Sequence, residues 1–287
     1  MFYCFVQDIF SLNIDQSKGG DTSSESLQFA SETNFNNINS IFSSKSNSYN
    51  TYGVYPQRYE PSLQATFYGV ATLDNLGKLD QAEKRDIIDY IMEHYNESSG
   101  LFMDKYAYKY LDTDFSQIYY PLSTVLEVNG YSILALERLG TLNLVDVNKM
   151  ISFIWSCYNP LSSGFIGQPY SSALRGYFNI STIDNTYYAI KTLDLLMSDW
   201  NSYSQQRNNL VSYINSLQIT DNYDWRYRGF INDIDANFNS LPGFTEPYLF
   251  SSYYSIKSLQ IFGMVGSINI NNFHLFLGIP EVLNHLF

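Results

Sequence analysis

Asp184, in the run "TIDNTYYAIK", is the acidic residue whose surroundings best suit chemistry. It stands at the start of a segment patterned as a helix. A carboxyl group buried there would have a raised pKa and could serve as a general acid. An aspartate in this place can instead cap a helix that begins at Thr186. Asp184 is therefore the candidate catalytic residue, with capping as the alternative.

A second group of acidic residues lies later in the chain, with Asp233 and Asp235 in "INDIDANF" and Glu246 in "FTEPY". In an extended segment, alternation places Asp233 and Asp235 on one side. Two carboxyl groups roughly 5 to 10 Å apart are the arrangement used in glycoside hydrolysis. The same residues also suit a solvated loop or a weak calcium site, although no EF-hand pattern is present.

A tyrosine-led motif recurs along the chain and predicts the elements that position these residues. Its copies read "YGVATLDNLG" from residue 68, "YSILALERLG" from 131, "YYAIKTLDLLM" from 187 and "YYSIKSLQIFG" from 253. The tyrosines that align are residues 68, 131, 188 and 254, at intervals of about 60 residues, the length of a two-helix unit. Small and apolar side chains occupy nearly every face of these segments, which predicts inner helices.

Other segments carry one apolar stripe and a polar back, which predicts outer helices. They are "DQAEKRDIIDYIMEHYN" (80–96), "DVNKMISFIWSCYN" (146–159) and "NNLVSYINSLQ" (208–218). Asp80 and Asp146 are the candidate N-caps of the first two, with Glu83 at capping-box spacing from Asp80.

A glycine followed by a bulky apolar residue ends each outer segment, at Gly100, Gly164 and Gly229. We expect these glycines to adopt positive φ as the chain turns back inward. The unit is then an outer helix, a Gly-aromatic turn, a long connection and an inner helix. The sequence predicts an all-α fold of about four to five such outer and inner helix pairs.

The tyrosines at the starts of the inner helices are the candidate ligand-binding residues: Tyr68, Tyr131, Tyr187, Tyr188, Tyr253 and Tyr254. Their aromatic faces can pack along an apolar ligand and stabilise positive charge. Packing between neighbouring helices is an equally weighted alternative.

The overall composition excludes several partners. Sixteen basic and 28 acidic side chains give a net charge of −12, the wrong sign for nucleic-acid binding. Cys4 and Cys157 make no disulfide framework, which fits a cytoplasmic setting. The start "MFYCFVQDIFSLN" lacks a secretory pattern, and no apolar run approaches the roughly 18 residues of a membrane span.

Two domains are predicted from these patterns. Residues 1–55 are rich in Ser, Asn and Gly and are predicted to be partly loop with one helix. Residues 56–287 contain the repeats and are predicted to form a single helical domain.

The inner segment "NTYYAIKTLD", preceded by "GFIGQP", resembles the repeats of the terpenoid cyclase and protein prenyltransferase β-subunit superfamily. The resemblance covers about residues 60 to 265. It implies an α/α toroid in which inner helices surround an apolar cavity. It also implies a long apolar, isoprenoid-like small-molecule ligand.

The catalytic groups that this resemblance implies are incomplete here. Protein prenyltransferases hold zinc with an Asp, a Cys two residues later and a His, whereas Asp184 is followed by Thr186 and no histidine stands at the next inner-helix start. No zinc or other cofactor is therefore expected. The D-x-D-D run of class II cyclases is matched only at Asp184, because Thr182 and Asn185 replace its neighbours.

The diphosphate-binding residues of the family are also incomplete. Gln168 stands where the family's Arg would fall. Charge-assisted bonds from Arg and Lys dominate diphosphate recognition. Basic residues in the connections suit either a binding rim or a solvated surface, and they are Lys105, Lys109, Arg175, Arg226 and Arg228.

Two functions remain open. One is an isoprenoid-binding toroid that, if an enzyme, acts as a transferase or cyclase through Asp184. The other is a non-catalytic toroid that serves as a protein-interaction module, with a glycoside-processing barrel less favoured. Four to five helix pairs are fewer than the six usual in prenyltransferase β subunits. We therefore expect the terminal segments, a partner protein or a second copy to close the ring.

Overall fold

The computed structural model describes residues 56–57, 60–104, 123–174, 176–221, 223, 229–233 and 247–268 of the chain. These residues fall into two compact units, one comprising the described residues up to 95 with 134–142 and the other the described residues of 96–133 and from 143 onward. The predicted N-terminal segment 1–55 lies outside the described residues, so the predicted domain division stays a prediction.

The first unit is built around helix α3 (Leu63–Asn75), followed by the 3-10 turn η1 (Leu79–Gln81) and α4 (Lys84–Glu93). Strands β1 (Pro56–Gln57) and β2 (Glu60–Pro61) pair antiparallel before α3. Ser62 caps α3, since its side chain accepts the Ala65 N–H at 3.1 Å. Helix α4 buries only Ile87 and Ile91, one stripe of its surface.

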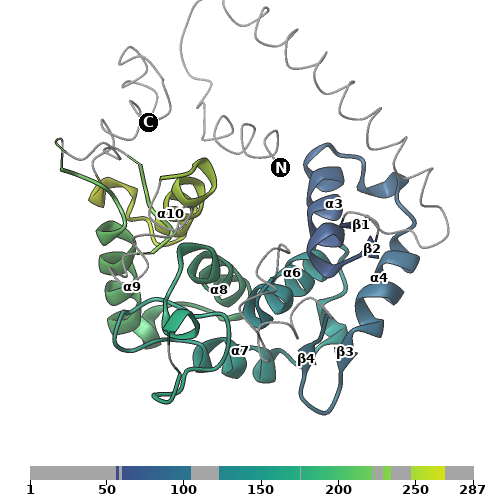
Figure 1. The fold of residues 1–287 in the computed structure, drawn as a ribbon. Coiled ribbons are helices and arrows are strands. Elements are labelled where there is room, and N and C mark those ends of the chain that lie inside the picture. The colour runs from purple at the N-terminus through teal and green to yellow at the C-terminus, as the bar shows by residue number, and fades with distance from the viewer. Residues whose placement is uncertain are drawn as a thin grey trace, which may run out of the picture. The chain divides into compact units, whose positions relative to one another are not determined.

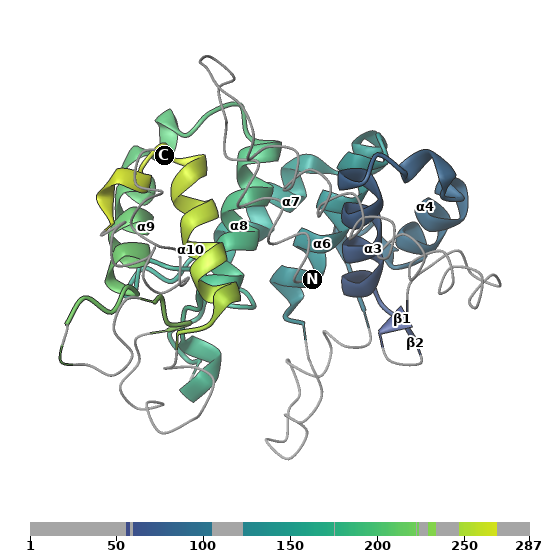
Figure 2. The same cartoon turned by 90° about the horizontal axis from the view of Figure 1, so that it is seen from above.

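The second unit holds most of the repeat (Figure 1). Its helices are α6 (Val125–Arg138), α7 (Val147–Ser156), α8 (Ile183–Leu196), α9 (Ser204–Ser216) and α10 (Leu249–Ile261). Its shorter elements are β3 (Tyr95–Asn96), β4 (Leu101–Phe102), η4 (Gly176–Asn179), η5 (Asn201–Tyr203) and η7 (Val265–Ser267). The division between the units falls within β3, after Ile133 of α6, and within η3 (Leu142–Leu144). Helix α8 packs against α10, while α7 packs on α8 and α9 on α10 (Figure 2).

Burial confirms the inner assignment of α6 and α8 and the outer assignment of α4, α7 and α9. Every residue of α6 from Val125 to Leu136 is buried, and so is most of α8. By contrast, α7 buries Met150, Phe153 and Ile154, and α9 buries only one side. A helix that is buried nearly all round must lie inside, which is what the apolar pattern predicts.

One of the two predicted N-caps is confirmed. The Asp146 side chain accepts the Lys149 N–H at 3.1 Å at the start of α7. The prediction for Asp80 is wrong, because that residue lies in η1 and α4 begins only at Lys84. Asp80 instead forms an exposed ion pair with Lys84 at 2.8 Å.

The glycines of the turns act in two different ways. Gly100 adopts φ of 73°, as predicted. In the next turn the positive φ falls on Ser163, so the prediction for Gly164 is wrong. A Cβ on Gly164 would lie 2.8 Å from the Tyr213 ring and from Ser181 Cβ, so this glycine is required for close approach.

A polar residue two positions before the aligned tyrosine ties each inner helix of the second unit to the preceding turn. The buried Phe102 N–H donates to Asn129 Oδ1 at 2.8 Å. In the equivalent places, Phe165 N–H donates to Thr186 Oγ1 at 3.0 Å and Phe230 N–H to Ser252 Oγ at 3.2 Å. A buried N–H without a partner costs about 1 to 3 kcal/mol. The repeats of the second unit therefore share this hydrogen bond between inner helix and turn as well as the apolar pattern.

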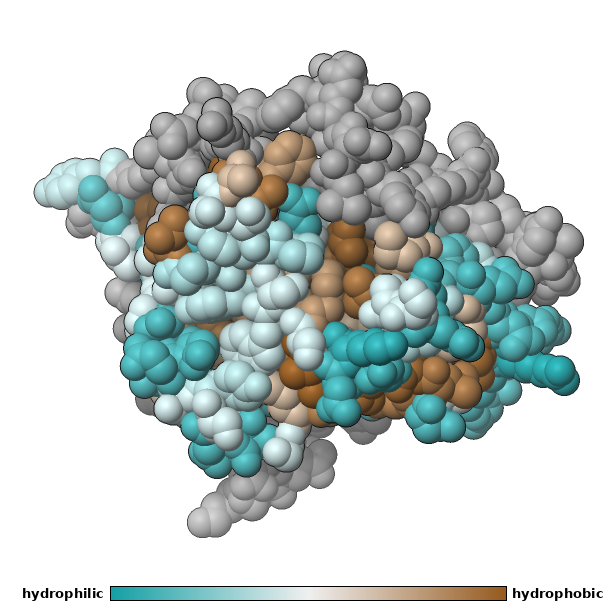
Figure 3. Space-filling view, turned by 90° about the horizontal axis from the view of Figure 1, so that it is seen from below, coloured by the Kyte–Doolittle hydropathy of each residue, from teal (hydrophilic) through white to brown (hydrophobic). Residues whose placement is uncertain are grey.

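The outer surface mixes polar and apolar side chains. Seen from below, hydrophilic residues are interspersed with hydrophobic ones over that face (Figure 3). Across the described residues, none of the helices is both long enough and apolar enough for a membrane span.

Candidate functional site

Two acidic side chains occupy equivalent positions on neighbouring inner helices. Asp184 lies four residues before Tyr188 on α8, and Glu127 lies four residues before Tyr131 on α6. Glu127 is buried and Asp184 is partly buried. Both lie in the first turn of their helix, where a carboxylate interacts favourably with unpaired N–H groups.

Glu127 belongs to a capping box at the start of α6. The Thr124 N–H donates to Glu127 Oε2 at 2.8 Å, and the Glu127 N–H donates to Thr124 Oγ1 at 3.1 Å. The Tyr131 hydroxyl donates to Glu127 Oε1 at 3.3 Å. The sequence "TVLE" carries this Thr-x-x-Glu signature, so the residue could have been found from the sequence and was missed.

A chain of side-chain hydrogen bonds links the two helix starts. Thr124 Oγ1 donates to Asn185 Oδ1 at 2.6 Å, and Asn185 Nδ2 donates to Thr182 Oγ1 at 2.7 Å. The Thr182 hydroxyl then donates to Asp184 Oδ1, which also accepts the Asn185 N–H at 2.8 Å. The donors therefore run from Thr124 toward the Asp184 carboxylate.

The capping alternative for Asp184 is wrong in its position. Helix α8 begins at Ile183 with Thr182 as the N-cap, so Asp184 lies inside the first turn and does not precede a helix at Thr186. The carboxylate nevertheless accepts a backbone N–H there. Asp184 as a catalytic residue stays a prediction.

Burial changes the acid–base properties of this cluster. Burial, and next the negative charge of Asp184, raises the pKa of Glu127 to about 8. Burial also raises the pKa of Asp184, against the lowering effect of hydrogen bonds led by that from Thr182. At neutral pH the pair of carboxyl groups therefore retains a proton.

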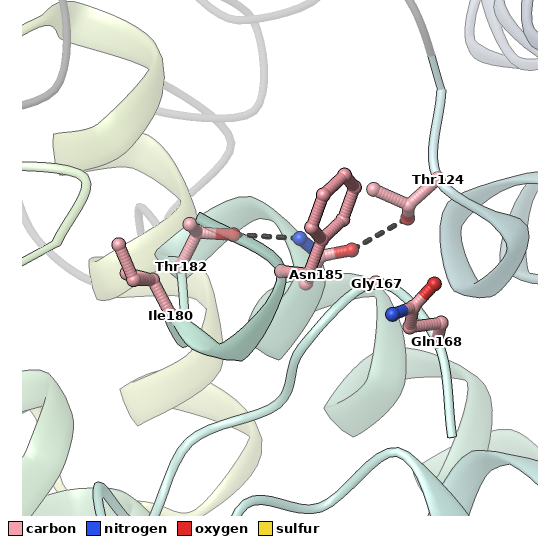
Figure 4. A pocket seen from close by; sticks show the side chains of 7 residues that line it. Thr124, Gly167, Gln168, Ile180, Thr182 and Asn185 are labelled. Atoms are coloured by element: carbon pink, nitrogen blue, oxygen red, sulfur yellow. Dashed lines mark hydrogen bonds between the residues drawn. The ribbon is translucent and has the colours of Figure 1, made fainter. Parts of the chain in front are cut away.

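A small pocket opens beside the cluster, lined by Thr124, Gly167, Gln168, Phe178, Ile180, Thr182 and Asn185 (Figure 4). Its volume is about 10 Å³, enough for one water-sized group. A Cβ on Gly167 would lie 2.4 Å from Thr124 Cγ2, and the Gly167 carbonyl accepts the Leu126 N–H at 3.0 Å. Glycine at this position thus lets the connection pass close to the start of α6.

Five of the predicted ligand-binding residues meet in one tyrosine cluster: Tyr131, Tyr187, Tyr188, Tyr253 and Tyr254. Tyr131 and Tyr188 meet edge to face at 4.6 Å, and Tyr187 stacks on Tyr254 at 4.7 Å. The first three are buried, whereas Tyr253 and Tyr254 are half-buried. These contacts join α6, α8 and α10.

Tyr68 is the remaining predicted ligand-binding residue and belongs to α3 of the first unit. It is half-buried, with its ring 5.2 Å from that of Phe67.

Comparison with protein families decides the identity of the fold. The model of the prenyltransferase alpha-alpha toroid domain matches residues 50–129 and 105–238, which is more than half of the chain. The chain belongs to this family. The predicted superfamily and the predicted all-α toroid fold are therefore confirmed.

A solved structure shows the same toroid fold. The Candida albicans protein geranylgeranyltransferase-I complexed with GGPP matches with a TM-score of 0.50 and 16% identity, and is one of 14 matching chains. The match covers 75% of this chain and 57% of the transferase chain, so the toroid described here spans little more than half of that relative. No curated protein matches the sequence.

Thr186 stands two residues after Asp184, the place of the Cys in the zinc pattern considered above. The Thr186 hydroxyl accepts the Phe165 N–H, which is the hydrogen bond between α8 and the preceding turn described above. Burial strongly raises the pKa of the thiol of Cys157, the residue that ends the outer helix α7. Among the described residues no three His, Cys, Asp or Glu side chains come together as a metal site. The expectation of no cofactor stays a prediction.

The other candidate residues are only partly placed. Asp233 is fully buried, and its charge contributes, after burial, to a raised pKa of Tyr213. Asp235 and Glu246 lie outside the described residues, so the carboxylate pair for glycoside hydrolysis stays a prediction. The basic residues of the connections also lie outside them: Lys105, Lys109, Arg175, Arg226 and Arg228.

Proposed function

We propose that this toroid binds a long apolar, isoprenoid-like molecule against the tyrosine cluster. The observation that carries the proposal is the gathering of tyrosines from three inner helices into one aromatic surface that is partly accessible on α10. Tyr254 is half-buried, and Phe250 lies 6.2 Å from it with 40% of its surface exposed. These rings form the accessible edge of the cluster.

The chemistry of this edge suits a hydrocarbon chain. Aromatic side chains offer a large apolar area at a small cost in side-chain entropy. Tyr248 stacks on Phe250 at 5.4 Å, which extends the surface along the start of α10. The solved relative is described as complexed with GGPP, which supports an isoprenoid as the ligand class. The proposal assigns binding and no reaction, because membership of a fold family does not determine chemistry.

Native mass spectrometry of the protein purified from cells tests the proposal. We expect an apolar adduct whose occupancy falls at least tenfold in Tyr254→Ala. The matched control is Tyr223→Ala, because Tyr223 is 93% exposed and distant from the inner helices in sequence. Its occupancy should equal that of the native chain, with thermal unfolding showing that both variants fold. Absence of any adduct, or an adduct that Tyr254→Ala leaves unchanged, would exclude this function.

A further inference from the structure

The pocket beside the acidic pair is lined by both polar and apolar residues and has no positive charge among its described lining residues. Thr124, Thr182 and Asn185 are bonded to one another, and their donors are directed toward Asp184. Each of their oxygen atoms keeps capacity to accept a further hydrogen bond. The pocket therefore favours a ligand group that can donate.

Gln168 is the lining side chain that remains available. It is more than nine-tenths buried, and its amide makes no hydrogen bond within the described part of the chain. In Figure 4 its side chain faces the same opening as Thr124 and Asn185. An amide without a protein partner is free to bond to a ligand in the pocket. An amide offers one acceptor and one donor group, which a single hydroxyl can satisfy together.

The surroundings disfavour an anion in this pocket. The starts of α6 and α8 would be the natural anion sites, but Glu127 and Asp184 already accept backbone N–H groups there. These carboxyl groups bring no positive charge in either protonation state. Lys191 and Lys149, two cations of the same unit, bond elsewhere, to the Tyr187 hydroxyl and to the Glu97 carbonyl.

We propose that this pocket binds the uncharged hydroxyl head group of a long-chain alcohol, in preference to a diphosphate. The inference rests on the proposed function, since the tyrosine cluster would hold the hydrocarbon chain. Gln168 accepts from and donates to the hydroxyl, and Phe178 and Ile180 cover the first carbons of the chain.

Equilibrium titration with two ligands of the same chain length, geranylgeraniol and geranylgeranyl diphosphate, tests the preference. We expect the alcohol to bind at least tenfold more tightly than the diphosphate. Equal or tighter binding of the diphosphate would overturn the head-group inference while leaving the proposed function intact. If neither binds, the proposed function fails and this inference fails with it.

Variants of Gln168 test whether its side chain determines the preference for the alcohol. We expect Gln168→Leu to weaken alcohol binding five- to tenfold, because the amide contacts are lost. Gln168→Arg should shift the preference at least tenfold toward the diphosphate by adding the missing cation. Gln205→Leu, on the exposed side of α9, is the matched control and should bind as the native chain does. Alcohol binding that Gln168→Leu does not change contradicts the proposal, even if Gln168→Arg fails to fold.

Discussion

The substitution Glu127→Gln is expected to stabilise the protein at pH 8 by roughly 2 to 4 kcal/mol and to have little effect at pH 5. Glu127 ionises near its ordinary pKa of 4.5 when unfolded but retains its proton to about pH 8 when folded. Between these values the unfolded state binds fewer protons, so the native chain loses stability as the pH rises. Glutamine can accept the Thr124 N–H with its oxygen and donate an amide N–H to the Tyr131 hydroxyl, so both contacts remain without the ionisation.

Urea unfolding of both proteins at pH 5 and pH 8 measures this difference. Glu97→Gln is the matched control, since that side chain is exposed, and it should change stability by less than about 0.5 kcal/mol at either pH. A native protein whose stability is constant from pH 5 to pH 8 would show that Glu127 is not buried as an acid. Asp184 has a pKa raised in the same direction, so some pH dependence should persist in the variant.

Tyr188→Ala is expected to destabilise the protein by about 3 to 5 kcal/mol, because it leaves a cavity in the middle of the tyrosine cluster. The Tyr188 ring contacts Tyr131 at 4.6 Å, Tyr187 at 5.0 Å and Tyr254 at 5.6 Å. Its removal therefore loosens the contact between three inner helices. The free energy of unfolding from urea titration gives the value.

Tyr188→Phe separates packing from hydrogen bonding at the same position. The ring remains, while the 3.3 Å contact between the hydroxyl groups of Tyr188 and Tyr254 is lost. We expect a cost of about 1 kcal/mol or less for this variant. A phenylalanine variant as unstable as the alanine variant would show that the cluster is held by its hydroxyl groups.

The helical repeat was predictable because the apolar residues of each copy recur at helical spacing along the sequence. The inner segments starting near residues 68, 131, 188 and 254 are helices α3, α6, α8 and α10. Burial on nearly every side of α6 and α8 favours small and apolar residues on every side, so their inner position follows from the pattern. The N-cap at Asp146 followed from a local signal of the same kind.

The polar site was less accessible to this reasoning because its partners are distant in sequence. Thr124 and Asn185 are 61 residues apart, and Phe165 and Thr186 are 21 apart, so no local pattern shows their hydrogen bonds. Glu127 could have been found by aligning the copies, which places it opposite Asp184. The position of Asp184 was missed because Thr182, an equally good cap, precedes it.

Photo-crosslinking tests most directly the central claim that the tyrosine cluster binds an isoprenoid-like chain. A geranylgeraniol analogue with a photoactivatable group along its chain is irradiated with the native protein, and the labelled peptides are identified by mass spectrometry. We predict saturable labelling within residues 248–258 or 183–191, competed by unmodified geranylgeraniol. Labelling confined to the outer helices α4, α7 and α9, or labelling that does not saturate, would contradict the account.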